Sequence, residues 1–543
     1  MLYLWIYILL CFVFTLSVIP PSKRSNFTLI ILLAGYIIYC FIFIFKSSFI
    51  VNGIRYFTLF DDAMISMRYA KNLAKGFGLV WNPGGGRVEG YSNFLWTLYM
   101  SFWHILPIHV SKISLLIQLT GLGFLLSGLF LVRKIAARLS GNNAFVILCS
   151  VVLTAAYLPI NFWALRGMET SVLGFIVIYV VWRVINSPDS ERIDYISFVL
   201  LGIGMLIRLD FAFLFVILSI SRVLVFRTNT MKNSLFSFLF FIAIISGETI
   251  FRWFYYRELL PNTYYLKVTG FPSFWRIERG AFAFLEFVNT ISPVIFIAVC
   301  IFVIFNRKNK AIIFLFSIYL SQILYSIYVG GDAWETWGNF ANRYLCIVMP
   351  VFFILLTLTI HSILKYITLS KIKNIISFIC VIFIIFQLHG GFKNIDLIHN
   401  QLLKATGMFV EIDKKMAQTG ILFKRMTYSQ ASLAVTWAGA IPYFSDRYCI
   451  DILGKNDLFI ARQKAKVCSY KEIRPGHNKY DYDYSIGKLK PDVITHYWGK
   501  FEEIAPYLNA YEPFLMKYGS AVYLLKNSKN IKWEMIKNPV SEI

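Results

Sequence analysis

Long apolar runs follow one another through the first 391 residues of this chain. A helix of about 20 apolar residues is long enough to cross the hydrocarbon core of a bilayer. Only 15% of the residues are charged, whereas a soluble domain carries about 25%. The pattern predicts a polytopic α-helical membrane protein with about 10 to 12 spans. The runs lie at 2–19, 28–46, 112–132, 144–162, 168–185, 195–226, 233–250, 287–306, 311–329, 344–364 and 374–391.

Three segments do not read as simple spans. Residues 1–19 are apolar and are followed by basic residues, the reverse of the charge order in a signal peptide. Whether they span the membrane is left open. The segment 94–109 is short and holds a histidine and a proline, so it could be re-entrant or interfacial. The run 195–226 is broken by Arg208 and Asp210, which suggests two short helices that meet at one face of the membrane.

Basic residues cluster between the runs, and such clusters mark cytoplasmic loops. The net charge of +24 is attributed to these basic loops, which would lie against anionic lipid headgroups. The absence of a basic stripe or nucleic-acid motif argues against a nucleic-acid partner. We therefore predict a transmembrane domain over 1–391 and a C-terminal domain over 392–543. The loops predicted to lie outside, on the same side as the C-terminal domain, are 47–93, 163–168, 251–286 and 330–343.

The region 392–543 has no apolar run long enough to span. It mixes strand-like runs at 493–495 and 521–525 with helical stretches such as 402–418, which predicts one small α/β domain. Cys449 and Cys468 lie in this region. If the region is extracytoplasmic, the two cysteines could form a disulfide.

Two adjacent acids, Asp61 and Asp62, open the polar loop that follows an early span. One carboxylate could act as a general base while the other orients it, as transfer of a sugar onto a hydroxyl requires. The same pair could instead be a solvated cap of the helix that begins near residue 64. Both interpretations stay open at this stage.

The predicted outside loops also carry groups that suit a phosphate. Arg68 lies close to the acid pair in sequence, Lys267 ends the segment that holds Asn262, and Arg343 lies at a span boundary where a lipid phosphate would lie. Cations stabilise a phosphate leaving group, although Arg and Lys at span ends often only anchor to headgroups. His477 and Lys479, in a predicted turn, could contact an anion or form a solvated loop.

The mid-run residues Arg208 and Asp210 could pair with each other or face a polar cavity, as ionisable groups within apolar runs usually do. Asp61 and Asp62 with Asp332 could hold a divalent cation. Since the nearby Arg and Lys could neutralise a phosphate alone, no metal or other cofactor is expected to be required.

An ordered set of motifs resembles the bacterial GT-C glycosyltransferases. The similarity is greatest to the family of the terminal β-(1→2) arabinofuranosyltransferase of cell-wall arabinan and its uncharacterised relatives. The motifs cover about residues 50–500 and are FDDAMISMRYAKNLAKGFGLVWNPGGGRVEGYSNFLWT (60–97), WALRGMET (163–170), LIRLDFAF (206–213), YYRELLPNTYYLK (255–267), YVGGDAW (328–334), NRYL (342–345), AGAIPYFS with DILGKND, and PGHNK.

The resemblance implies a GT-C fold with a C-terminal periplasmic domain, a polyprenyl-phosphate sugar donor and a saccharide acceptor. It implies that Asp61 or Asp62 is the base. It also implies that Arg68, Lys267 and Arg343 contact phosphate or sugar, with Asp332, Glu169 and His477 as further candidates. Leu209 stands where the family commonly has proline, and the loop 330–343 is rich in tryptophan. The sugar, linkage and acceptor therefore stay open.

We predict a membrane glycosyltransferase of the cytoplasmic membrane. It would transfer a sugar from a polyprenyl-phosphate donor to a cell-envelope glycan, glycolipid or protein on the outer face. A flippase or transporter of lipid-linked saccharides is one alternative, but such proteins often have two related halves, and no repeat is visible. A non-catalytic scaffold in envelope assembly is the other, and replacing Asp61 by Asn would separate it from an enzyme.

Overall fold

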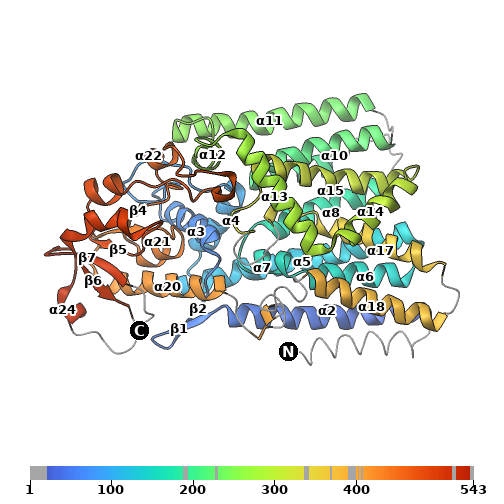
Figure 1. The fold of residues 1–543 in the computed structure, drawn as a ribbon, viewed down its shortest axis with the longest axis horizontal. Helices are drawn as coiled ribbons and strands as arrows, with labels where there is room; N and C mark the ends of the chain where they lie inside the picture. The colour runs from blue at the N-terminus through green and yellow to red at the C-terminus, as the bar shows by residue number, and fades with distance from the viewer. Residues whose placement is uncertain are drawn as a thin grey trace.

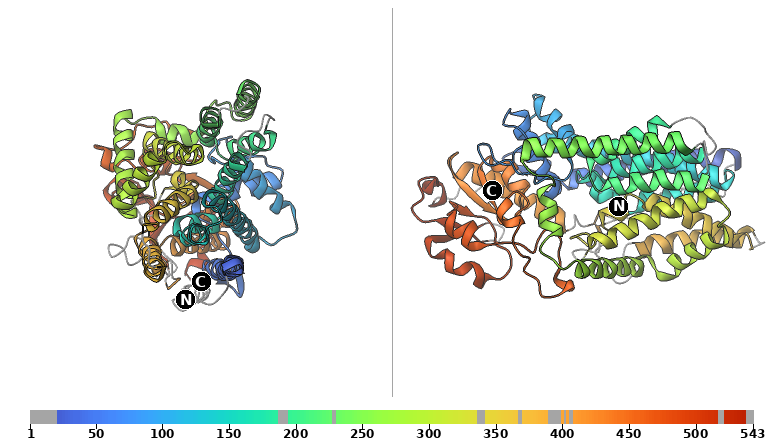
Figure 2. Two further views of the ribbon diagram at one scale, coloured as in Figure 1. Left: turned by 90° about the vertical axis from the view of Figure 1, so that its right-hand side faces the viewer. Right: turned by 90° about the horizontal axis from the view of Figure 1, so that it is seen from above.

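The computed structural model describes residues 21–186, 194–226, 230–335, 342–366, 370–388, 399–400, 403–404, 408–516 and 521–537. Within these residues a long helical bundle lies at one end of the molecule and a unit with a β-sheet at the other (Figure 1). Seen end on, the helices run side by side (Figure 2). The segment 1–19 lies outside the described residues.

The bundle is built from the predicted apolar runs. Four described helices are long and apolar enough to cross a membrane, or up to six if each of two bent helix pairs counts as one span, and shorter apolar helices lie among them. The bundle contains α2 (Pro21–Lys46), α5 (Val110–Ser140), α6 (Ala144–Ala156), α8 (Thr170–Asn186), α9 (Tyr195–Ile207), α10 (Phe211–Phe226), α11 (Thr230–Tyr256), α13 (Ser273–Ile291), α14 (Pro293–Phe305), α15 (Lys310–Val329), α17 (Met349–Leu364) and α18 (Ser370–Leu388).

Two predictions about the irregular segments can be compared with the structure. The run 195–226 forms two helices, α9 and α10, which are separated at Arg208 and Asp210 as predicted. In the segment 94–109 the helix α4 (Phe94–Ile105) has 12 residues. At 1.5 Å per residue it is about 18 Å long, which is short of a 30 Å hydrocarbon core. It packs along α3 (Asp61–Ala74) beside the sheet unit.

The sheet unit has five strands in the order β4-β3-β5-β7-β6. β3 pairs in parallel with β4 and β5, while β7 pairs antiparallel with β5 and β6. The predicted strands at 493–495 and 521–525 correspond to β5 and β7. The strands are β3 (Ser432–Val435), β4 (Tyr448–Asp451), β5 (Val493–Ile494), β6 (Tyr511–Leu515) and β7 (Ala521–Leu525).

Helices join this sheet to the bundle. α20 (Met408–Met426) precedes the sheet and packs against α21 (Ala440–Ser445), which connects β3 to β4. α21 in turn packs against α3. The predicted helical stretch 402–418 overlaps α20 from Met408 onward, and residues 401–402 and 405–407 lie outside the described part of the chain. Cys449 is buried in β4, Cys468 is exposed, and both are free thiols, so the structure does not contain the disulfide that could have joined them.

A buried ion pair connects the two units. Arg166, which follows α7 (Leu158–Leu165), donates to Asp413 of α20 at 2.6 Å, and both side chains are at most 1% exposed. The same guanidinium donates to the carbonyls of Thr58 and Leu59. Because these residues directly precede α3, Arg166 fixes the entry of α3 between the bundle and the sheet unit.

Candidate active site

A cavity of about 270 Å³ lies where the bundle meets the sheet unit. Residues from the loops predicted to lie outside contribute to its lining, and so do two segments of the sheet unit. Five basic and three acidic side chains line it, together with apolar and aromatic residues. The ionisable lining residues are Asp62, Arg208, Asp210, Arg252, Lys267, Asp332, Arg343, Lys455 and His477.

Asp62 is the acid of the predicted pair that faces this cavity. It lies in the first turn of α3, where a carboxylate also interacts favourably with the helix dipole. Arg343 donates to its Oδ2 at 3.0 Å, and the ammonium of Lys455 contacts Oδ1. Burial alone would raise the pKa of Asp62, but Lys455 and Arg343 together hold it well below its ordinary value. Asp62 is therefore ionised in this arrangement and accepts hydrogen bonds from both cations.

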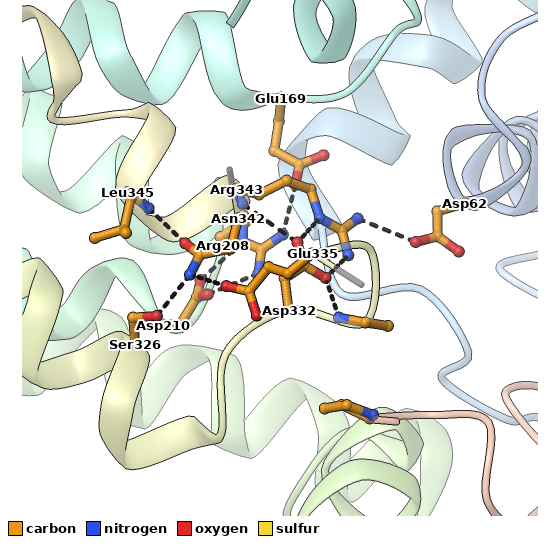
Figure 3. Close-up of polar contacts among 12 residues, drawn as sticks. Asp62, Glu169, Arg208, Asp210, Ser326, Asp332, Glu335, Asn342, Arg343 and Leu345 are labelled. Carbon is orange, nitrogen blue, oxygen red and sulfur yellow. Dashed lines mark hydrogen bonds and ion pairs between the residues drawn. The ribbon is translucent and has the colours of Figure 1, made fainter. Parts of the chain in front are cut away.

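Arg343 is held in place by Asp332. Its Nε and Nη2 donate to the two carboxylate oxygens at 2.7 and 2.9 Å, and its backbone N–H donates to the same group at 3.2 Å. This two-pronged geometry fixes the plane of the guanidinium. Its remaining Nη1 reaches Asp62 (Figure 3). Burial opposes ionisation of Asp332, but Arg343 prevails and lowers the pKa of Asp332 to about 2.

Among the described residues, Lys267 is the lining cation without a hydrogen-bond partner. It lies in the last turn of α12 (Asn262–Val268). In the part of the chain that the structure describes, no acceptor lies within hydrogen-bond distance of its ammonium. Gly476, with a φ of +83°, lies over its aliphatic stem. Burial, followed by the nearby Arg343, lowers the pKa of Lys267 to about 8.

Arg208 and Asp210, predicted either to pair or to face a cavity, do both. Arg208 donates to Asp210 at 2.9 and 2.6 Å and to Glu169 at 2.8 Å. Glu169 is fully buried and also accepts from Asn93 at 3.0 Å. Glu169 thus fixes the guanidinium of Arg208 (Figure 3) but does not itself line the cavity.

His477 lies in the cavity wall among aromatic rings. Its ring centroid is 5.5 Å from that of Trp334 and 5.4 Å from that of Trp498. Arg474 lies over both tryptophans. Burial, followed by the charge of Lys455, lowers the pKa of His477 to about 3. The imidazole is therefore neutral, and it does not add a fixed charge to the site.

Asp61 has a different environment from its neighbour. Its carboxylate accepts the N–H groups of Gly439 at 3.2 Å and of Ala440 at 2.8 Å, at the start of α21. Consecutive helical residues point about 100° apart, so Asp61 faces the sheet unit while Asp62 faces the cavity. Burial raises the pKa of Asp61 to about 7 despite these N–H groups. Of the two carboxylates offered as the base, Asp61 therefore does not line the cavity.

Three other predicted site residues do not line the cavity. Arg68 donates to the Trp81 carbonyl and to Asp446 and thus joins α3 to the sheet unit. The ammonium of Lys479 donates to backbone carbonyls at 2.8 Å. Asn262 donates to three carbonyls of the loop that carries Lys455. The guanidinium of Arg68 donates its hydrogen bonds to acceptors of the protein itself. This geometry does not support the prediction that Arg68 contacts phosphate or sugar.

Sequence reasoning missed Lys455 as a site residue, although it lies in the motif DILGKND. It also left Arg252 unassigned, and this side chain lines the cavity between Glu89 and Glu248. The signal for Arg252 was its place at the end of an apolar run. Lys455 had no such signal, because it reaches Asp62 across 393 residues of sequence.

The suggested cation site is not assembled. Asp62 and Asp332 share Arg343, whereas Asp61 is directed to α21. No group of three or more His, Cys, Asp or Glu side chains in the described residues is arranged to hold a metal ion. Nothing in this arrangement tests whether the protein requires a metal, so independence from metal stays a prediction.

Comparisons with known proteins place this geometry in context. A family described as a domain of unknown function (DUF8728) matches residues 406–534. The terminal β-(1→2) arabinofuranosyltransferase of Mycobacterium tuberculosis is 27% identical over 215 residues, which cover 37% of this chain and 34% of that protein. The match thus spans about a third of the curated relative.

Two solved structures share the fold over most of the chain. ArnT from Cupriavidus metallidurans bound to undecaprenyl phosphate aligns with a TM-score of 0.56 at 11% identity, covering 91% of this chain and 97% of that one. ArnT in the apo state aligns with a TM-score of 0.52 at 10% identity, covering 90% and 97%. The fold is therefore that of the polytopic GT-C membrane proteins with a C-terminal unit containing a sheet, as predicted.

Proposed function

We propose that this protein is a GT-C glycosyltransferase that uses a polyprenyl-phosphate sugar as donor. The observation that carries the proposal is the ammonium of Lys267, which has no hydrogen-bond partner among the described residues and faces the same cavity as the ionised Asp62. A half-buried cation without an acceptor calls for an anionic ligand. A nearby carboxylate calls for a proton donor such as a saccharide hydroxyl.

The reaction follows from these two groups. The anomeric C–O bond to the phosphate breaks, and Lys267 and Arg343 stabilise the negative charge that the departing phosphate gains. The acceptor hydroxyl forms the new bond to the anomeric carbon and gives its proton to Asp62. The products are the glycosylated acceptor and a polyprenyl phosphate. Asp332 does not react but keeps the guanidinium of Arg343 in its orientation.

The charges of the cavity suit a donor with a single phosphate. Among the described lining residues, each cation except Lys267 contacts at least one carboxylate. Arg208 contacts Glu169 and Asp210, Arg252 contacts Glu89 and Glu248, Arg343 contacts Asp332 and Asp62, and Lys455 contacts Asp62. Lys267 is therefore the described lining cation that can take up the single negative charge of a phosphodiester. The other four cations already contact six carboxylates, so the second phosphate of a diphosphate would meet no free cation among the described lining residues.

The membrane environment supports a lipid-linked donor. The cavity wall includes Leu209, Val268 and Val329 beside its charged groups, so an apolar chain and a phosphate can be bound next to each other. The solved relative with the same fold has undecaprenyl phosphate bound. The curated relative is an arabinofuranosyltransferase, which makes a pentofuranose the first sugar to test. We place the site at the outer face of the cytoplasmic membrane and expect a glycan, glycolipid or protein acceptor.

The proposal can be tested on the purified full-length protein in nanodiscs. Binding of undecaprenyl phosphate and of undecaprenol is measured for the native chain, for Lys267→Met and for the control Lys466→Met, which changes an exposed lysine of the sheet unit. We expect the phosphate to bind the native chain at least tenfold more tightly than the alcohol. Lys267→Met should lose that preference, and the control should keep it.

Labelled sugar transfer from a set of polyprenyl-phosphate donors then identifies the sugar. Native protein that prefers neither lipid, and that transfers no sugar with any acceptor extract, would refute the proposal. In that case the scaffold and transport alternatives would remain.

A further inference from the structure

The sheet unit contributes a positively charged side chain, Lys455, to the cavity wall. The segment 406–534, which matches the family of unknown function, contributes Lys455, Pro475 and His477 to the cavity wall. Because His477 is neutral, Lys455 is the charged group among these three. Its side chain is 14% exposed and its ammonium contacts Asp62.

The loop that carries Lys455 is stabilised from inside the sheet unit. Asp451, the last residue of β4, accepts the N–H groups of Leu453 and Gly454 at 3.1 Å. Its second oxygen accepts both the backbone N–H and the side-chain amide of Asn456 at 2.8 Å. A single buried carboxylate therefore sets the path of the loop on both sides of Lys455.

The bundle side fixes the same loop from outside. The side-chain amide of Asn262 donates to the carbonyls of Gly454 at 3.0 Å, Lys455 at 2.9 Å and Asp457 at 3.3 Å. Gly90 approaches so closely that a Cβ there would lie 2.0 Å from Asn456 Oδ1. These contacts are more than is needed to close a surface turn. They place one lysine at a defined point of the cavity.

We infer that Lys455 is a donor-binding residue that changes partner during the reaction. In the empty site its ammonium is held by Asp62, and in the filled site it contacts the phosphate of the donor. The segment of unknown function would thus complete the active site of the bundle. This inference rests on the proposed function, since it needs an anionic donor in the cavity.

The exchange has a chemical consequence for Asp62. A lysine ammonium has three N–H donors on a flexible stem and can turn from one acceptor to another. Arg343 cannot turn in this way, because Asp332 holds it at two points. When Lys455 moves to the phosphate, Asp62 loses one of its two cations and accepts a proton more readily. The base would thus be released only when donor is present.

The first test measures binding of undecaprenyl phosphate and undecaprenol to the native chain, Lys455→Met, Lys455→Arg and the control Lys466→Met. We expect Lys455→Met to weaken binding of the phosphate about tenfold and to leave the alcohol unchanged. Lys455→Arg should recover most of the affinity, and the control should match the native chain. If Lys455→Met binds the phosphate as tightly as the native chain does, the inference is wrong.

A second test needs no substitution. Amine-reactive labelling of Lys455 in the native chain, read by peptide mass spectrometry, should fall at least threefold when undecaprenyl phosphate is added. Labelling of Lys466 should stay constant. In the same samples, carbodiimide labelling of Asp62 at pH 5 should rise, because the carboxyl loses a cation. Unchanged labelling of both groups would overturn the exchange of partners.

The two proposals fail in different ways. A native chain that binds undecaprenyl phosphate no better than undecaprenol contradicts the proposed function itself. A native chain that prefers the phosphate and is unaffected by Lys455→Met contradicts only the role of Lys455.

Discussion

Replacing each of the two adjacent acids by asparagine should separate catalysis from folding. Asp62→Asn keeps the size of the side chain and its contact with Arg343, but it removes the proton acceptor. General-base catalysis contributes about 10² to 10⁴ in rate, which equals about 3 to 5 kcal/mol of barrier. We therefore expect kcat to fall by that factor, while undecaprenyl phosphate binds at least as tightly as to the native chain, because a neutral amide holds Lys455 less firmly than the carboxylate does.

Asp61→Asn should act mainly on stability. Its amide oxygen can still accept the Ala440 N–H, now 2.8 Å from Oδ1, but its NH₂ replaces the oxygen that also faces Gly439. An unsatisfied buried group costs about 1 to 3 kcal/mol. Because burial raises the pKa of Asp61 to about 7, the folded state holds this proton more tightly than the unfolded state. The stability from this group is therefore largest below about pH 4 and is lost as the pH rises through about 7.

Three measurements decide between the two roles. They are sugar transfer, binding of undecaprenyl phosphate, and thermal unfolding in detergent at pH 5 and pH 8, each on the native chain and both variants. Asp61→Asn should unfold at a lower temperature, with the larger deficit at pH 5, and folded protein should retain transfer. If folded Asp61→Asn loses transfer while Asp62→Asn keeps it, the assignment of the two carboxylates is reversed and the reasoning from the cavity is refuted.

Further expectations concern the charges and the joint between the units. Affinity for undecaprenyl phosphate should decline above about pH 8, where Lys267 loses its proton, and Lys267→Arg should remove this decline; an unchanged alkaline limb would contradict the assignment. Arg166→Met or Asp413→Asn alone should cost about 3 to 5 kcal/mol of stability, because each leaves a buried group without its partner; the paired substitution should cost less than the sum in a double-mutant cycle of unfolding measurements. Gly439→Ala should unfold at a lower temperature, since its Cβ would lie 2.0 Å from the first carbonyl oxygen of α3, whereas Gly123→Ala, which meets nothing within 4 Å, should be neutral or slightly stabilising.

Sequence reasoning recovered the features that depend on local pattern. In the described part of the chain, the apolar runs of membrane length form helices, and the break at Arg208 and Asp210 separates α9 from α10. The charged loops meet at one end of the bundle because odd and even spans carry their loops to opposite sides. Arg343, Lys267 and Asp332 were predicted as site residues because they lie in these loops.

The side-chain directions could not be derived in this way. Asp61 and Asp62 are chemically identical, and only the start of α3 and the position of α21 decide which one faces the cavity. Arg68 and Lys479 looked like anion ligands, but backbone carbonyls of distant segments accept hydrogen bonds from them. Lys455 needed a contact across 393 residues. Such pairings follow from the packing of the two units, which no local pattern encodes.

The boundary between the two units also bears on engineering. Asp61 holds the start of α21, Asn262 holds the loop around Lys455, and Arg166 holds Asp413. The C-terminal unit is thus not an interchangeable attachment. A chimera that takes this unit from a relative would need matching residues at all three contacts. Without them, the side chains that line the cavity would no longer be held in position.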